Sequence, residues 1–110
     1  MADIPLIQIK EMFEGMRNEA GWNTNADLLW GYFFFHPDKE RLDKLAEKLT
    51  TMDYRVVDIR LTNDGSSYVL HAERVETHTP RSLFERNGEL NRLAVTYGVV
   101  YDGMDAGPVL

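Results

Sequence analysis

Three histidines, His36, His71 and His78, are the side chains best suited to hold a metal ion, because imidazole is a common ligand and the sequence contains no cysteine. Ligands on one helix usually lie three to five residues apart, and no two of these histidines have that spacing. We therefore expect no metal site and interpret each histidine as a strand-end or surface residue. His71 is the best placed for a role, because strand alternation puts it on one face of a sheet.

Neighbouring carboxylates offer a second kind of chemistry, since a general acid and a general base are often two such groups with separated pKa values. Pairs occur at Asp102 and Asp105, at Glu73 and Glu76, and within residues 38–40. The chain has 18 acidic residues, however, so neighbouring carboxylates arise by chance. We interpret them as solvated surface charges rather than as a catalytic pair.

Motifs for covalent catalysis and for phosphate or cofactor binding are missing from the sequence. Ser66 and Ser67 follow a turn glycine, but the residues around them do not form a nucleophile elbow. There is no GxGxxG or Walker phosphate loop, and the lack of cysteine excludes thiolate catalysis, disulfides and cysteine zinc sites. We expect a protein that has no cofactor and catalyses no reaction.

The net charge indicates the kind of partner. With 18 acidic and 12 basic residues the chain carries a formal charge of -6 at pH 7, which repels nucleic acid phosphates and anionic membranes. Trp30, Tyr32 and Tyr68 offer rings on which RNA bases could stack, but residues 67–74 lack the basic-Gly-aromatic signature of RNA-binding sheets. We expect a protein partner with a cationic surface, and no direct contact with nucleic acid or membrane.

The length of 110 residues fits a single domain with one core, covering residues 1–110. Hydrophobic residues make up 44% of the chain, enough for a folded globular protein. No apolar run approaches the roughly 20 residues that cross a bilayer, and the N-terminus lacks a basic segment followed by an apolar run. These features predict a cytoplasmic protein.

The first half of the chain is typical of a helix, a strand and a second helix. Apolar residues recur at helical spacing over residues 5–20, and Gly21 is a suitable helix end. Residues 28–35 are apolar or aromatic at nearly every position, which predicts a central strand. An amphipathic helix over residues 37–52 follows, opened by a proline and an aspartate.

The central strand is expected to have two unlike faces. Gly31 leaves room for a closely packed helix on the side of Leu29, Phe33 and Phe35. Trp30 and Tyr32 carry polar groups, which suit a wetter face. We therefore predict that Trp30 and Tyr32 lie on the side of the sheet that contacts solvent or a partner.

The second half begins with a hairpin. Residues 54–61 and 67–75 are strand-like, and Asp64-Gly65 between them tolerates positive φ angles, so antiparallel pairing is the economical interpretation. Residues 79–97 then predict a helix that starts with a Thr-Pro cap, followed by a short last strand over residues 99–101.

The predicted order is α-β-α-β-β-α-β. Each crossover helix joins strands that lie parallel, while the hairpin supplies an antiparallel pair, and a ferredoxin-like βαββαβ sandwich with an additional N-terminal helix satisfies both conditions. Gly88 lies inside the last helix, so we expect that helix to bend there or to begin properly after it. The N-terminal helix could cover the open face of the sheet, pack at an edge, or help a dimer to form.

The segment from Leu90 to Gly103 ends in Val-Val-Tyr-Asp-Gly and resembles the C-terminal helix, strand and Tyr-Asp-Gly turn of the regulator of ribonuclease E activity B (RraB) family. The resemblance covers about residues 5–107 and implies a ferredoxin-like sandwich with an N-terminal helix. It also implies an acidic, non-catalytic protein that binds ribonuclease E and modulates RNA processing. Two features differ: Met104 stands where the family usually has Trp, and the long acidic C-terminal tail of the better-known members is missing.

Two interpretations of the Tyr-Asp-Gly segment remain open. In the structural one, Tyr101 closes the core, Asp102 accepts amide hydrogen bonds within a turn, and Gly103 adopts positive φ. In the functional one, these three residues join Trp30 and Tyr32 in a protein-binding surface, where aromatic side chains often dominate the binding energy. The leading hypothesis is a regulator that binds ribonuclease E or another protein of RNA processing. The alternative is a small enzyme or ligand-binding domain with its site on the open sheet face.

Overall fold

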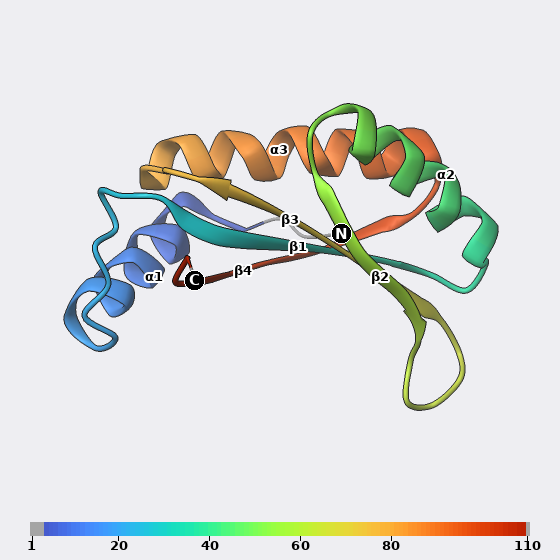
Figure 1. The fold of residues 1–110 in the computed structure, drawn as a ribbon, viewed down its shortest axis with the longest axis horizontal. Helices are drawn as coiled ribbons and strands as arrows, with labels where there is room; N and C mark the ends of the chain where they lie inside the picture. Colours follow the sequence, from blue (N-terminus) through green and yellow to red (C-terminus); the bar gives the residue numbers. More distant parts are fainter. Residues whose placement is uncertain (1–3, 110) are drawn as a thin grey trace.

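Three helices and one four-stranded antiparallel sheet form the α+β fold of this protein, seen here in a computed structural model that describes residues 4–109 (Figure 1). The strands interleave with the helices along the chain, as the hydrophobic periodicity predicts. The helices are α1 (Leu6–Asn18), α2 (Lys39–Thr51) and α3 (Pro80–Tyr97), and the strands are β1 (Leu28–His36), β2 (Arg55–Leu61), β3 (Tyr68–Glu76) and β4 (Val100–Gly107).

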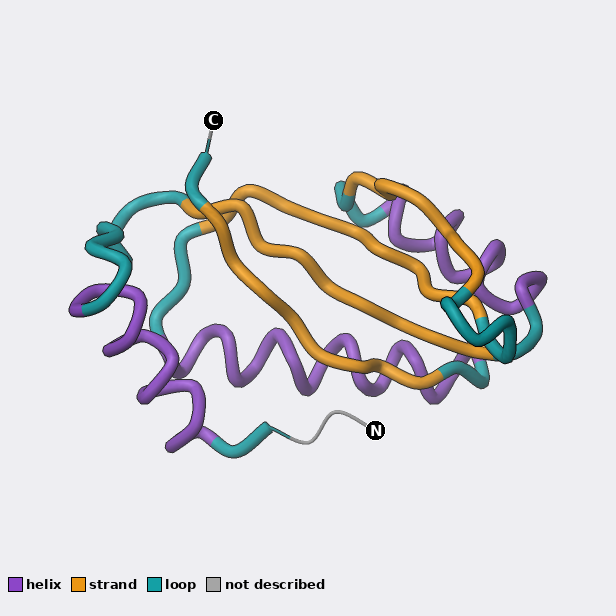
Figure 2. The backbone as a smooth tube through the Cα atoms, turned by 90° about the horizontal axis from the view of Figure 1, so that it is seen from below, coloured by secondary structure: helices purple, strands orange, loops and turns teal. Residues whose placement is uncertain are grey.

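The strand order across the sheet is β2-β3-β1-β4, and every neighbouring pair is antiparallel. The hairpin β2–β3 pairs as expected, and the central strand β1 lies between β3 and β4, far from both in sequence. Helix α2 leads from β1 to β2, and α3 leads from β3 to β4. Both helices pack on the same side of the sheet and leave its other side without a helix (Figures 1 and 2).

Helix α1 packs beside α3 and does not cover the open side of the sheet (Figure 2). Its buried face consists of Ile9, Phe13 and Met16. The ring of Phe13 stacks on Trp30 of β1, with 6.0 Å between ring centroids. This contact places α1 in the helix layer, so α1 does not cover the open face of the sheet, which was one of the positions left open by the sequence.

Side-chain caps fix the starts of α2 and α3. Asp38 accepts a hydrogen bond from the Glu40 amide at the N-terminus of α2. Thr79 and Ser82 form a reciprocal capping box at the start of α3. Helix α3 runs through Gly88 as one helix of 18 residues, so the predicted late start after Gly88 is wrong. The packing of the helix against the sheet outweighs the propensity cost of one glycine.

The predicted facing of β1 is wrong. Trp30 and Tyr32 lie against the helices, with 1% and 0% of their surface exposed, whereas Phe33 and Phe35 lie half-buried on the open side. The polar group of Trp30 does not require solvent, because its Nε1 donates a hydrogen bond to the Glu76 carbonyl oxygen at 3.1 Å. A satisfied polar group lets a large aromatic side chain enter the core.

The last strand is longer than predicted, and the Tyr-Asp-Gly segment is a β-bulge within β4 rather than a turn. Phe33 pairs with Gly103 and Phe34 pairs with Tyr101, so Asp102 is the extra residue of the bulged strand. Gly103 has the expected positive φ, 124°. Glycine tolerates this conformation, so the strand continues through the bulge.

None of α1, α2 and α3 combines the length and the apolar composition that a bilayer crossing requires.

Candidate functional site

Of the five residues predicted to bind a partner, only Asp102 is exposed. Trp30, Tyr32 and Tyr101 are among the largest fully buried side chains, and Gly103 is buried as well. The structure brings Tyr101, Asp102 and Gly103 together at the bulge, and it places Trp30 and Tyr32 in the core beneath the helices. Because the three aromatic side chains are buried, they cannot contact a partner directly, and Asp102 is the only one of these five residues that a partner can reach.

Tyr101 and Gly103 hold the bulge that presents Asp102. The Tyr101 hydroxyl donates a hydrogen bond to Asn87 Oδ1 of α3 at 2.6 Å, and both residues are buried. The Tyr101 ring lies 5.1 Å from that of Phe34, and burial raises the pKa of the phenol. This hydrogen bond ties β4 to α3 directly before the exposed carboxylate.

Removing the Tyr101 hydroxyl should weaken the fold. In Tyr101→Phe, Asn87 Oδ1 loses its donor inside the core, and we expect the free energy of unfolding to fall by about 1–2 kcal/mol. Urea denaturation followed by circular dichroism measures the change. Tyr97→Phe, on the half-buried end of the same helix, is the matched control and should change stability by less than about 0.5 kcal/mol. Equal effects of the two variants would contradict this role for the hydroxyl.

A cluster of charged side chains, the Glu76 cluster, joins the end of β3 to α3. It consists of Glu76, His78, Arg86, Arg74 and the ring of Tyr54. The Glu76 carboxylate contacts His78 Nε2, Arg86 at 3.1 Å and Arg74 at 3.2 Å, and its side chain is only 10% exposed. Both guanidinium groups also lie over the Tyr54 ring, at 5.2 and 5.9 Å from its centroid.

The Glu76 carboxylate is held in its ionised form. Burial alone would raise its pKa, but the hydrogen bond from His78 and the charge of Arg86 outweigh burial, so the pKa lies below the usual glutamate value. The opposite holds for the phenols of Tyr32 and Tyr54, whose pKa values are raised first by burial. The negative charge of Glu76 raises the pKa of Tyr32 further.

The cluster also contains the atoms of a hydrolytic triad, because Ser82 Oγ lies 2.8 Å from His78 Nδ1 while Glu76 contacts the opposite ring nitrogen. Ser82 Oγ, however, accepts a hydrogen bond from the Thr79 amide as part of the helix cap. A nucleophilic hydroxyl needs an open site with donors aimed at a developing oxyanion, whereas this hydroxyl stabilises the first turn of α3. The geometry therefore favours a structural role for the cluster.

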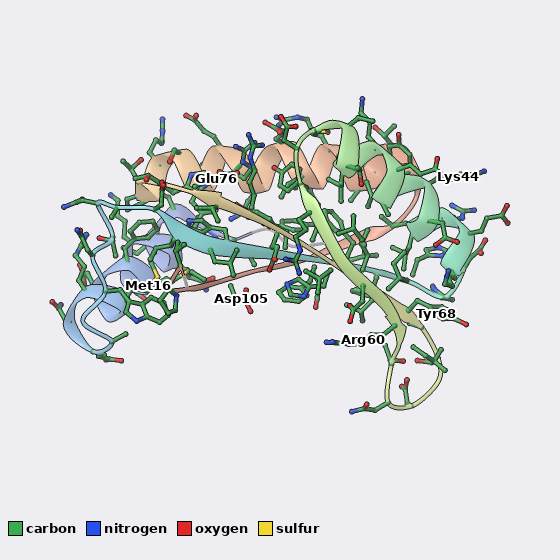
Figure 3. All side chains as sticks on the ribbon, viewed as in Figure 1. Met16, Lys44, Arg60, Tyr68, Glu76 and Asp105 are labelled. Carbon is green, nitrogen blue, oxygen red and sulfur yellow. The ribbon has the colours of Figure 1, made fainter. Side chains whose placement is uncertain are left out.

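Sequence reasoning missed this cluster because it treated Glu73 and Glu76 as solvated neighbours. Strand alternation separates them: Glu73 faces the open side of the sheet at Gly31. Glu76 lies with the helices, next to α3 (Figure 3). The available signal was the short sequence distance between Glu76 and His78, directly before a helix cap.

The open face of the sheet is the second candidate site. Here the strands place residues in four rows that run across the sheet, three of them from β2 to β4 and one from β3 to β4. The members of the rows are Val75, Leu29 and Gly107; Arg55, Glu73, Gly31 and Asp105; Asp58, His71, Phe33 and Gly103; and Arg60, Val69, Phe35 and Val100. The middle of the face therefore holds mainly apolar side chains together with Glu73 and His71, and further charges lie at both edges, as Arg60 and Asp105 show (Figure 3).

The centre of the open face is built around Gly31. A Cβ atom on Gly31 would collide with Asp105 Oδ1 and would lie 3.0 Å from His71 Nε2, so these side chains fill the space above the glycine. The His71 ring stacks on Phe33, with 4.5 Å between centroids. The expectation that Gly31 makes room for a helix is wrong, since side chains of the open face take that place.

A groove of about 640 Å³ lies at one end of the open face, beyond the last residue pair of β2 and β3. Leu29, Val75 and Val109 supply apolar surface, and Val75 is 49% exposed. Arg55 and Glu73 line the groove as well and form an ion pair at 3.3 Å. Exposed apolar surface with charged walls is typical of an interaction surface.

The three histidines lie apart from one another. His71 is on the open face, His78 is in the Glu76 cluster, and His36 accepts a hydrogen bond from the Asp38 amide at the end of β1. Among residues 4–109 no three histidine or carboxylate side chains gather as a metal site would require.

A comparison with models of protein families identifies the family of this chain. The model described as regulator of ribonuclease activity B matches residues 6–106, from the first turn of α1 to the end of β4. A search of curated protein sequences finds no match to the chain. The match covers every helix and strand, including the bulge that contains Asp102. This chain therefore belongs to the regulator of ribonuclease activity B family.

Proposed function

We propose that this protein regulates ribonuclease activity by binding a protein of the RNA-processing machinery, with ribonuclease E as the first candidate, and that it catalyses no reaction itself. The observation that carries the proposal is the family match over residues 6–106. The net charge of -6 supports a protein partner over RNA, because it opposes phosphate binding. The fold proposed for this role is the ferredoxin-like sandwich with an additional N-terminal helix, and the observed strand order β2-β3-β1-β4 supports it.

The proposed contact is the bulge of β4. Asp102 is exposed there on an edge strand, and Tyr101 and Gly103 position it from within the fold. A fixed carboxylate of this kind suits an arginine or lysine of the partner, since charge complementarity speeds association and selects the register of binding. Trp30 and Tyr32 act indirectly in this proposal, by maintaining the core beneath the sheet.

Binding and inhibition test the proposal. Purified ribonuclease E is titrated with the protein at low salt, while cleavage of a labelled RNA and complex formation are measured. We expect complex formation together with reduced or redirected cleavage, and the charge reversal Asp102→Lys should weaken the complex at least about tenfold. Glu47→Lys, an exposed acidic residue on α2, is the matched control and should bind like the natural protein.

Two results would count against the proposal. If no complex forms with ribonuclease E at low salt, that partner is wrong. If Asp102→Lys and Glu47→Lys bind equally well, the contact lies elsewhere. The rival function, an enzyme or a ligand-binding domain on the open face, predicts instead that a small molecule binds with a change in the His71 or Phe33 NMR signals.

A further inference from the structure

The open face of the sheet carries opposite charges at its two edges. Arg55, Arg60 and Asp58 lie on β2, where Asp58 pairs with Arg60 at 3.8 Å and leaves a net positive charge. Asp105 lies on β4 and has no ion-pair partner among residues 4–109. The Arg55 side chain is 74% exposed, so its bond to Glu73 leaves further donors accessible. Between these edges lie the exposed Val75 and half-buried apolar residues of β1 and β3.

Arg55 and Asp105 belong to the same row, at its opposite ends. The row runs from Arg55 through Glu73 and Gly31 to Asp105, because each residue pairs directly with the next one across the sheet. A surface whose positive and negative ends are related in this way can be complementary to itself. Two-fold symmetry then forms each favourable contact twice.

We propose that the open face is the interface of a homodimer, in which a second copy of this chain packs face to face about a two-fold axis parallel to the strands and between β3 and β1. With such an axis, β2 of one copy lies opposite β4 of the other and β3 lies opposite β1, while each row of one copy lies opposite the same row of the other. Arg55 of one copy then lies opposite Asp105 of the other, and the contact is repeated on the far side of the axis.

The other rows fit the same arrangement. Val75 comes to lie opposite Leu29, and Phe35 lies opposite Val69, so apolar residues meet apolar residues near the axis. The exposed charges at the edges meet an opposite charge or an uncharged residue in every row: Arg60 faces Val100, and Asp58 faces Gly103. No row pairs two residues of like charge. Glu73 faces Gly31, over which the Asp105 side chain lies, so Asp105 meets both Glu73 and the arginine that is bonded to Glu73, Arg55.

A two-fold axis perpendicular to the strands gives a poorer match. It would set β2 against β2 and β4 against β4, so that arginines of one copy approach arginines of the other and Asp105 approaches its own counterpart. Like charges placed in this way repel. The parallel axis is therefore the one that the charges select.

Sheet geometry permits the edge contacts. Two packed sheets are usually rotated by about 30°, which moves side chains at the sheet edge by only about 4 Å relative to each other. The long arginine side chain spans a displacement of that size. Because Arg55 and Asp105 stand on edge strands, their contacts lie at the rim of the interface, where charges set register and specificity.

The size of the face predicts a weak dimer. Strands of seven to nine residues, about 4.8 Å apart, give the open face an area of roughly 500 Å² per copy. The total of roughly 1,000 Å² lies at the lower end of specific interfaces, so we expect a dissociation constant on the order of micromolar to tens of micromolar. The dimer would therefore form or dissociate with protein concentration.

Sedimentation equilibrium of the full chain, over a concentration series, tests the dimer and its register. Wild type should shift from monomer to dimer, and each charge reversal, Arg55→Asp or Asp105→Arg, should weaken the dimer at least about tenfold because each breaks two symmetric contacts. The double variant, Arg55→Asp with Asp105→Arg, should recover wild-type affinity to within about threefold. Lys44→Glu, on the exposed side of α2, is the control and should leave the dimer unchanged.

Mixing the two single variants gives the sharpest result. Neither variant should associate with itself, because Arg55→Asp carries aspartate at both positions and Asp105→Arg carries arginine at both. In an equimolar mixture the two aspartates of one chain lie opposite the two arginines of the other, so heterodimers should form. Circular dichroism first establishes that each variant is folded. If a charge-reversal variant does not fold, the uncharged substitution at the same position, Arg55→Gln or Asp105→Asn, replaces it. Three results would each overturn the proposal. The wild type could stay monomeric up to about 1 mM, the single reversals could leave the dimer intact, or the mixture of the two variants could fail to associate.

This proposal does not depend on the proposed function, because association of the purified chain is measured without ribonuclease. If the wild type stays monomeric but binds an arginine-rich peptide through Asp105, the face belongs to a cationic partner, and the homodimer is excluded. Failure of the ribonuclease assay, in contrast, would leave the sedimentation results unaffected.

Discussion

Glu76→Gln should lower the free energy of unfolding by about 3 kcal/mol. The glutamine side chain keeps the shape of the glutamate but removes the charge that compensates Arg86 and Arg74, and a buried ion pair that loses one partner is destabilised by several kcal/mol. The loss is a large fraction of the roughly 5–15 kcal/mol that stabilises a typical domain. Chemical denaturation at neutral pH measures it.

Glu73→Gln is the control for this change, since Glu73 is on the same strand and bonds to an arginine that is 74% exposed. Exposed ion pairs contribute little, and we expect a loss below about 1 kcal/mol. If both glutamine variants lost the same stability, the Glu76 cluster would have no special role in the fold.

The Glu76 cluster should also affect how the free energy of unfolding changes at acidic pH. The folded-state pKa of Glu76 is depressed below the ordinary value of 4.5, so its ionised form stabilises the fold above that value, and this contribution is lost as the pH falls through the lowered pKa. Asp64, whose pKa is lowered to about 2 by hydrogen bonds from Thr62 and Ser66, acts in the same direction. The comparison between wild type and Glu76→Gln isolates the contribution of Glu76: the variant should lose less stability between neutral and acidic pH.

Trp30→Ala should lower the free energy of unfolding by about 4 kcal/mol, most of the stability of a domain at the lower end of the typical range. The indole is 1% exposed, stacks on Phe13 of α1 and meets the His78 ring edge-on at 5.4 Å, so its removal opens a large cavity between β1 and the helices. Circular dichroism during urea denaturation measures the loss. Partner binding should fail together with the fold rather than separately from it.

Leu29→Ala is the matched comparison, because Leu29 is the neighbouring residue on the half-exposed side of the same strand. We expect a loss of about 1 kcal/mol there, since the smaller burial leaves less apolar surface to lose. A Trp30→Ala protein as stable as Leu29→Ala would place the indole at the surface after all, and would restore the docking role that the sequence suggested for it.

The fold was largely accessible from the sequence because periodicity, caps and turn residues agree with one another. Apolar spacing located α1 and α2, the Thr-Pro pair marked the start of α3, and Asp64-Gly65 marked the hairpin. The facing of β1 was not accessible, since nearly every residue from Leu28 to Phe35 is apolar and alternation carries no signal in such a run.

The candidate site was harder to predict because its features depend on contacts between distant segments. The bulge at Asp102 follows from a register shift against β1, and a Tyr-Asp-Gly segment alone is equally typical of a turn. The Glu76 cluster requires Arg86, ten residues away on α3, to return over the end of β3. The family resemblance succeeded because it rests on the whole segment rather than on one contact.

The position of β4 has a consequence for how the chain folds during its synthesis. β1 is the first strand to leave the ribosome, yet one of its two neighbours, β4, is the last strand of the chain. Until then the strongly apolar β1 has an unpaired backbone edge, which other nascent chains can bind. The sheet can therefore close only after β4 has been synthesised, and slow synthesis of the segment between β1 and β4 would prolong exposure to aggregation and to chaperones.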